Sequence, residues 1–409
     1  MSAYSSVLKT PGVARIIAAQ LTARFPSGML SLGMLLHIEQ VHASYTAAGL
    51  VLAGGAAGQA VAGPLTSRLM GRLGIRPVLA VTTAVCAAGI LLIAFVTMPV
   101  PLTVLVSFVA GLATPPVQPA VRTIYPKLVT SQLLTPLFSL DASAQEIIWI
   151  AGPVVVTFVS TQVSTVLGLV LCAFFMVFGG LWFLLSPELG RVRIPRSKRR
   201  FGVVLTRPTV LLSTIVGLLL IGSCSAVEAG VVANFQGTGT DASAHGYQSG
   251  VVLAIWSLGS LIGGFAFGHL PLSPWALARR MFLMFAGVAL AAAWLNIWWM
   301  IPALLVSGAG IAPALAAMFA MTSSSVKFSD TAEAFGWIGT GQLIGAGIGS
   351  AVAGVVIDEH GAQGAFLVSA AVALLGVIVA ALGVRKLPDL RGRDSSPIPD
   401  TEPIAIQPS

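Results

Sequence analysis

Two stretches of this sequence, GLVLAGGAAGQAVAG at residues 49–63 and GVVLAIWSLGSLIGG at residues 250–264, repeat each other 201 positions apart. Six of the fifteen positions are identical. Three of these pair a glycine with a glycine: Gly49 with Gly250, Gly58 with Gly259, and Gly63 with Gly264. The repeat indicates that the chain consists of two equivalent units.

The composition places both units in a lipid bilayer. Apolar residues make up 56% of the 409 residues and charged residues only 9%, whereas a soluble domain carries roughly 25% charged residues. A membrane-spanning helix needs about 20 mostly apolar residues and satisfies its own backbone hydrogen bonds. Twelve such helices are predicted, at residues 12–37, 44–68, 77–98, 102–125, 134–160, 164–186, 209–235, 247–269, 278–297, 300–324, 332–357 and 362–384.

The charges in the loops predict how these spans are oriented. One set of alternate loops contains no Lys or Arg and carries the acidic residues Glu39, Asp241, Asp358 and Glu359. The other set is basic, at Lys9 and Arg15, 68–76, 122–127, 191–207, 279–280, Lys327 and 385–393. Basic loops stay in the cytoplasm, so both termini are predicted to be cytoplasmic, in the cytoplasmic membrane. The net charge of +8 then reflects orientation and contact with lipid headgroups rather than a nucleic-acid partner.

The longest polar interruption divides the spans into six and six. We therefore expect a bundle over residues 1–186, a basic cytoplasmic loop over 187–208 and a second bundle over 209–386. Residues 387–409 are polar and rich in proline, so a disordered cytoplasmic tail is predicted there. The three cysteines lie inside predicted spans, which predicts neither disulfides nor a zinc site.

Twelve spans, a long basic central loop and a six-plus-six repeat resemble the major facilitator superfamily. The resemblance implies an all-α membrane protein of two pseudo-symmetric six-helix bundles. It also implies a monomeric secondary transporter that moves a small molecule by alternating access, without a cofactor.

Two short motifs carry the resemblance further. After the second span, SRLMGRLGIRP matches the family's loop motif at Arg72, Gly74 and Arg76, but Gly71 stands where an Asp usually helps to latch the cytoplasmic gate. In the fifth span, Gly152 and Pro153 are similar to a motif of the family's proton-coupled exporters. Such exporters also carry an Arg in span four, where this chain has Ser107.

Charged residues inside the spans are the candidates for function, because each costs about 2.5–3.5 kcal/mol to insert. Spans four and five form a hairpin, in which Arg122 and Asp141 lie equally far from the turn. The two are predicted to form an ion pair, either structural or at a gate.

Glu146 lies about 7 Å deeper than Asp141, at the predicted depth of Arg24 in span one. We expect these two to pair, and two interpretations stay open. Glu146 is either a proton-coupling group modulated by Arg24, or half of a fixed salt bridge.

Two further carboxylates receive different predictions. Glu228 in span seven has no basic residue at its depth in its own half. It is either a proton- or substrate-binding group or an uncharged structural hydrogen-bond partner. Asp330 and Glu333 form a capping-box pattern at the start of span eleven, which favours a structural role for Glu333.

Polar and aromatic side chains inside the spans are candidates for the wall of a substrate cavity. Gln118, Asn234 and Trp256 are the main ones, with interhelical hydrogen bonding and core packing as the alternatives. Prolines interrupt spans one, four and ten, at Pro26, at 115–119 and at Pro313. Broken helices at mid-membrane are typical of transporter binding sites.

No nucleotide-binding loop, catalytic motif or metal cluster is found, so we expect a non-enzyme that an ion or substrate gradient drives. The favoured function is proton-coupled export of a small, partly apolar compound, that is, an efflux antiporter. Import of a metabolite or sugar is the alternative within this fold. A membrane receptor or scaffold that transports nothing is the alternative from another class.

The orientation can be tested by labelling. Tags at both termini should be cytoplasmic, and cysteines placed near Asp241 or Glu359 should react with an impermeant reagent added outside. Labelling of both loops only from the cytoplasm would contradict the predicted orientation.

The predicted ion pair can be tested by a double-mutant cycle. Arg122→Ala and Asp141→Ala should each cost about 3–5 kcal/mol, because each leaves a partner charge buried and alone. The double variant should recover part of that loss, as measured by thermal stability in detergent. Two independent, additive losses would show that the residues do not interact.

Overall fold

A computed structural model describes residues 3–191, 200–235, 242–268, 270–393 and 395–400. The described residues are almost entirely helical. The helices of the first half are α1 (Ala3–Lys9), α2 (Val13–Arg24), η1 (Phe25–Gly28), α3 (Leu30–His42), α4 (Tyr45–Leu73), α5 (Ile75–Phe95), α6 (Val100–Leu112), α7 (Val117–Leu128), α8 (Ser131–Ala144), α9 (Glu146–Gln162), α10 (Thr165–Leu185) and α11 (Pro187–Arg191). Those of the second half are η2 (Val203–Thr206), α12 (Pro208–Phe235), α13 (Ala242–Phe267), α14 (Ala276–Ala293), α15 (Ile297–Ser325), η3 (Phe328–Asp330), α16 (Thr331–Leu382) and η4 (Val384–Lys386).

The twelve predicted spans agree with these helices. Ten helical segments are long and apolar enough to cross a membrane. One of them, α16, contains two spans joined at Gly361, whose φ of 65° is incompatible with a continuous helix. The first span is α2, η1 and α3 taken together, interrupted at Pro26. Within the described residues the count is therefore twelve.

Helix breaks occur in three spans. Span one is broken by η1, span four between Leu112 and Val117, and span five at Gln145. The break at Gln145 was not expected. The break expected at Pro313 is absent, since α15 runs through it without interruption.

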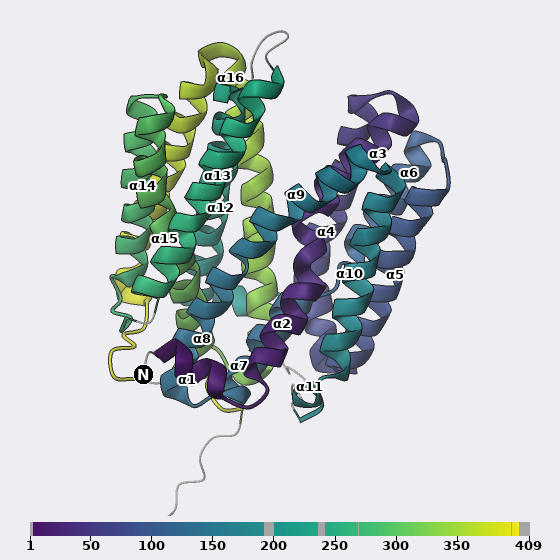
Figure 1. Cartoon of the computed structure of the whole chain (residues 1–409). Helices are drawn as coiled ribbons and strands as arrows, with labels where there is room; N and C mark the ends of the chain where they lie inside the picture. The colour runs from purple at the N-terminus through teal and green to yellow at the C-terminus, as the bar shows by residue number, and fades with distance from the viewer. Residues whose placement is uncertain (1–2, 192–199, 236–241, 269, 394, 401–409) are drawn as a thin grey trace, which may run out of the picture.

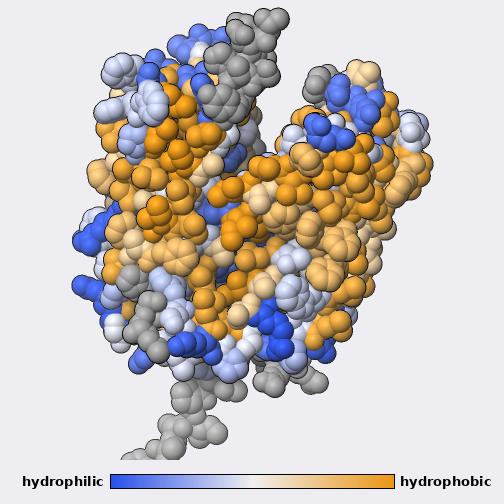
Figure 2. Space-filling model, viewed as in Figure 1, coloured by the Kyte–Doolittle hydropathy of each residue, from blue (hydrophilic) through white to orange (hydrophobic). Residues whose placement is uncertain are grey.

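The molecule consists of two helical bundles that meet at one end and diverge at the other (Figure 1). The end where they meet, here called the closed end, carries α1, α11 and the α7–α8 turn. The opposite end, here called the open end, carries the α5–α6 turn. A space-filling view shows a V-shaped cleft there and an apolar surface around the middle of the molecule (Figure 2). This surface is the part suited to contact lipid.

The sequence repeat lies at equivalent positions in the two halves. Gly58 on α4 packs against the backbone of α6 at Phe108, and Gly259 on α13 packs against the backbone of α15 at Leu305. Five residues further on, each repeat touches the opposite half. Gly63 packs against Gly336 of α16, and Gly264 packs against Ser143 of α8. The repeated glycines therefore serve two contacts in each half, one inside the half and one across to the other.

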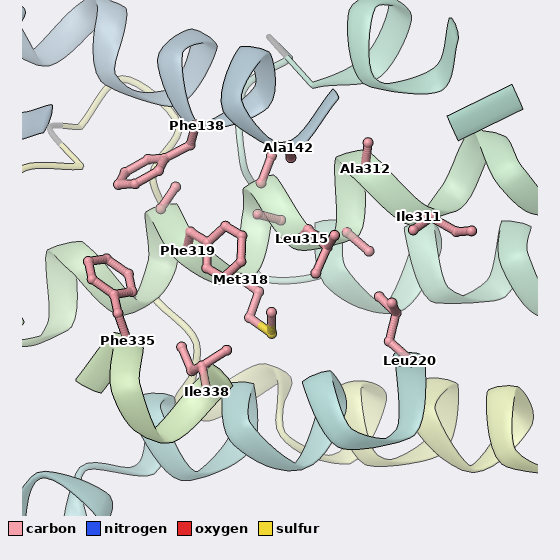
Figure 3. Packing of buried hydrophobic residues seen from close by; sticks show 14 of the residues in the cluster. Phe138, Ala142, Leu220, Ile311, Ala312, Leu315, Met318, Phe319, Phe335 and Ile338 are labelled. Atoms are coloured by element: carbon pink, nitrogen blue, oxygen red, sulfur yellow. The ribbon is translucent and has the colours of Figure 1, made fainter. Parts of the chain in front are cut away.

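An aromatic cluster fills the space between the halves at the closed end (Figure 3). Phe138 of α8 points toward Phe319 of α15 and Phe335 of α16, with ring centroids 6.5 and 6.2 Å away. Tyr125 of α7 lies on the other side of Phe138, at 5.8 Å. These four rings, here called the aromatic plug, are buried and exclude water from the closed end.

The C-terminal tail differs from its prediction. Residues 401–409 lie outside the described residues, but the chain from 388 to 400, apart from residue 394, follows the closed end instead of being disordered. The Leu390 amide donates to the Leu272 carbonyl (2.9 Å), and Ile398 exchanges backbone hydrogen bonds with Val326 (2.9 Å) and Phe328 (3.0 Å).

One side chain of the tail reaches the first half. The Ser395 hydroxyl lies 2.9 Å from the Thr135 hydroxyl at the start of α8. Composition alone missed this segment because backbone hydrogen bonds and two buried side chains, Leu387 and Leu390, hold it in place.

The glycine-rich start of α16 provides a stability test. A methyl group on Gly345 would lie 2.0 Å from the Leu218 carbonyl oxygen of α12, whereas one on Gly347 would meet no atom within 4 Å. Gly345→Ala should therefore lower the melting temperature in detergent, since overpacking costs about 1–3 kcal/mol. Gly347→Ala, the matched control, should be neutral or stabilising. Equal melting temperatures for the two variants would contradict the close α12–α16 packing.

Candidate functional site

The carboxylate of Asp141 is the centre of a buried polar cluster in the first half. Its two oxygens accept from the Arg122 Nε (2.9 Å) and the Gln20 Nε2 (3.0 Å). Arg24 also lies 3.6 Å from it. The predicted contact between Arg122 and Asp141 is thus present, on adjacent helices of the α7–α8 hairpin. Two guanidinium groups around one carboxylate leave the cluster with one positive charge in excess.

Amide side chains hold the two arginines in place. Arg24 donates to the Gln20 Oε1 (2.8 Å) and to the Gln145 Oε1 (2.5 Å). Gln118, oriented with its amide oxygen toward Arg122, accepts a hydrogen bond from Nη2 of that residue at 2.8 Å. Gln118 therefore lies in the polar cluster, as a partner of Arg122 one turn away on the same helix, α7.

Arg122 also connects the cluster to the aromatic plug. Its guanidinium carbon lies 3.5 Å from the centroid of the Phe319 ring, which belongs to the second half. A guanidinium over an aromatic face is attracted to the ring electrons. Arg122 therefore interacts with Asp141 in its own half and with Phe319 across the interface.

Glu146 does not pair with Arg24, which corrects the prediction. Arg24 is bound to Asp141, Gln20 and Gln145, whereas Glu146 accepts a hydrogen bond from the Ser260 hydroxyl at 2.8 Å. Glu146 is the first residue of α9, directly after the break at Gln145. The break redirects the chain, so that Glu146 faces α13 of the other half, and its side chain is buried there.

Glu228 is the second carboxylate near the interface. It is exposed, on a helix whose other residues are mostly buried. It also acts electrostatically on Glu146, a residue of the opposite half. An exposed carboxylate near the opposite half faces the cleft rather than lipid, where an exposed charge would be costly.

The loop motif after span two is placed at the closed end. Gly74 has a φ of 94° between α4 and α5, a conformation that favours glycine. Arg72 is exposed, and Arg76 lies beside α11 at Gly190. Among the described residues, none of the three forms an ion pair with the other half, which leaves the latch to a neighbouring residue.

That neighbour is Arg68, which pairs with Glu333 of α16 at 3.2 Å. Glu333 also accepts from the Gly202 amide (2.7 Å) at the end of the central loop. The capping-box prediction for Glu333 is therefore wrong, since its carboxylate turns toward the other half and the Asp330 side chain makes no capping bond to α16. A carboxylate from α16 supplies the charge that Gly71 lacks.

The remaining candidates have mainly packing roles. Gly152 of α9 lies against the backbone of Gly28 in η1, so the motif of Gly152 and Pro153 brings spans one and five together. The Asn234 amide donates to the Leu295 carbonyl (3.2 Å). Trp256 is buried and donates to Ser307 (3.4 Å).

Sequence reasoning missed three polar residues of this region. Ser260 follows Gly259 of the repeat and is equivalent to Gln59 in the first half. The repeat therefore pairs a polar residue with a polar residue at this position, and this could have identified Ser260 as a candidate. Arg68 was assigned only to a basic loop. Arg280 was likewise assigned only to a basic loop. It is in fact buried and donates to the carbonyls of Pro313 (2.6 Å) and Phe267 (2.8 Å).

The described residues contain no group of three or more His, Cys, Asp or Glu side chains that could hold a metal ion. The chemistry of the region is instead that of buried carboxylates, two arginines and amide side chains between two mobile units.

Solved structures of transporters share this arrangement at low sequence identity. A bacterial homologue of the iron transporter ferroportin, in an outward-facing state, superposes with a TM-score of 0.72 at 13% identity, over 90% of this chain and 98% of its own. The human organic anion transporter MFSD10 gives 0.67 at 16% identity, over 90% and 99% of the two chains. The proton:xylose symporter XylE gives 0.69 at 12% identity, over 95% and 98%.

Comparison with curated proteins gave no match. The model of the Major Facilitator Superfamily, in contrast, matches residues 16–295 and 271–406, nearly the whole sequence. Two six-span bundles, a repeat at equivalent positions and a closed and an open end agree with that match. The chain is a multi-pass membrane transporter, not an enzyme, and it belongs to the Major Facilitator Superfamily.

Proposed function

We propose that this transporter is a proton-coupled exporter of a small, partly apolar compound. The observation that carries the proposal is Glu146, a buried carboxylate at the interface of the two halves. It accepts a hydrogen bond from the Ser260 hydroxyl, and the nearby arginines are engaged with Asp141. A buried carboxylate without a cationic partner is costly when ionised and much less so when protonated.

The orientation follows from the charges. The closed end carries Lys9, Arg15, Arg72, Arg200 and Lys327, whereas Glu359 lies beside the Gly361 bend at the open end. Basic residues favour the cytoplasmic side. In that orientation the cleft faces outward, and protons from outside reach Glu228 in the cleft before they reach Glu146 at its base.

The cycle then has a simple order. Protonation of Glu146 in the outward-open state permits the halves to rock, and the closed end opens to the cytoplasm. The proton leaves inside, and the substrate binds there and is carried outward on the return. The aromatic plug between the halves is apolar and buried. It supports a partly apolar substrate over a sugar, whose hydroxyl groups need many hydrogen-bonding partners.

Import by the same cycle in reverse is the second candidate. The exposed Glu228, which could bind a polar substrate, favours it. The receptor alternative depended on the missing Asp at Gly71. The pair of Arg68 and Glu333 offers a charged contact between the halves at that place, which removes this support.

A ligand is needed before transport can be measured. Purified protein should be screened with a panel of organic anions, organic cations, sugars and neutral apolar compounds for an increase in melting temperature, because a ligand that binds only the folded state stabilises it.

With such a ligand in liposomes, Glu146→Gln should retain exchange of labelled for unlabelled ligand. It should lose accumulation driven by a pH gradient, because a glutamine cannot take up a proton. The expected loss is at least tenfold.

Glu39→Gln is the matched control. Glu39 lies in the same half, near the open end and away from the interface, so this variant should accumulate ligand as the parent does. If Glu146→Gln also accumulates ligand with an unchanged pH profile, Glu146 is not the coupling group, and Glu228→Gln becomes the next variant to measure.

A further inference from the structure

Three side chains of the first half lie along one stripe of α13 in the second half. Near the closed end, the Ser139 hydroxyl donates to the Gly264 carbonyl (2.7 Å). Ser143 packs against Gly264 so closely that a side chain there would collide with it. Glu146 accepts from Ser260. These contacts, here called the α13 seam, end at Glu146, so the carboxylate occupies the last position before the cleft.

The Ser260 hydroxyl donates one hydrogen bond and accepts another. A hydroxyl group has one proton to donate. The Ala312 amide of α15 donates to the Ser260 oxygen (3.2 Å), so the Ser260 proton is directed to the Glu146 Oε1. Ser260 is completely buried. Two helices of the second half, α13 and α15, therefore hold one donor in a fixed position toward a carboxylate of the first half.

We propose that Ser260 is a positioning residue that makes the closure of the α13 seam depend on the protonation of Glu146. This inference rests on the proposed proton coupling and adds the residue that transmits it. A hydrogen bond to an ionised carboxylate is roughly twice as strong as one to a neutral group. Ionised Glu146 thus holds Ser260 across the seam more tightly than protonated Glu146 does, and this bond offsets part of the cost of burying the charge.

The other charged groups around Glu146 do not replace this contact. Glu228 and Cys224 face it from α12. Arg24 of α2 and Arg122 of α7 are engaged with Asp141 of α8. On α3, His37 is bonded to Thr165 and Ile93, and Glu39 and His42 lie toward the open end. Between Gln248 and Phe267, α13 has no titratable side chain, and neither does η1; α10 has only Cys172.

The test measures the conformational equilibrium and needs no substrate. Spin labels on Val96→Cys and Trp294→Cys, both exposed at the open end and in different halves, report the width of the cleft. The three native cysteines are buried. The contribution of Ser260 is the ratio of outward-open to other states in the parent protein divided by the same ratio in Ser260→Ala. This quotient should fall about tenfold between pH 8 and pH 5, the range expected for one charge-assisted hydrogen bond.

Ser260→Ala should lower the ratio at pH 8 about tenfold relative to the parent and leave the ratio at pH 5 nearly unchanged, because it removes the donor that the ionised carboxylate binds. Ser257→Ala, one turn earlier on α13, is the matched control and should follow the parent. In the Glu146→Gln background, Ser260→Ala should produce no further pH dependence. If Ser260→Ala does not fold, Ser260→Cys keeps the volume with a much weaker donor and should lower the ratio at pH 8 in the same way.

The outcomes separate the two proposals. A Ser260→Ala or Ser260→Cys profile identical to that of Ser257→Ala, with Glu146→Gln flat, overturns the role of Ser260 and leaves proton coupling intact. A Glu146→Gln profile that still depends on pH like the parent contradicts the proposed function itself.

Discussion

The close approach of the two halves at one end is the constraint on which the rest of the structure depends. Gly63 lies against the backbone of Gly336, and Gly264 lies against the side chain of Ser143, each in the opposite half. Side chains would hold them apart. Because these contacts lie at equivalent places in the two repeats, the interface is nearly symmetric about the molecular centre. The aromatic plug, the pair of Arg68 and Glu333 and the α13 seam all form between surfaces that the glycines bring together.

The buried carboxylates form two groups, according to whether their partners lie in the same half or in the opposite half. Asp141 binds Arg24 and Arg122 within one half, so these ion pairs can move with that half, whereas the contact of Arg122 with Phe319 crosses the interface. Glu146 and Glu333 instead bind groups of the opposite half, Ser260 and Arg68. These contacts cannot survive a relative rotation of the halves. The structure thus contains two kinds of buried carboxylate. One kind stabilises a single bundle, and the other binds across the interface and depends on the relative position of the two bundles.

The fold could be predicted from the sequence because hydrophobic length, loop charge and the repeat are properties of the chain alone. The Arg122–Asp141 contact was also accessible, since both residues lie on one hairpin and their depth follows from counting. The partners of Glu146 and Glu333 were not. Depth places a residue along a helix but not around it, and the break at Gln145 turns Glu146 toward α13. Glu333 matched a local capping pattern, and no local pattern reveals an arginine 265 positions away.

The tail described at the closed end has a mechanical consequence. Ser395 is bonded to the first half and Ile398 to the second. Three residues of extended chain reach at most about 11 Å. The tail is therefore a tether of fixed contour length across the interface. The closed end can widen only as far as this length permits before an anchor must release, so the chain carries its own limit on how far the two halves separate.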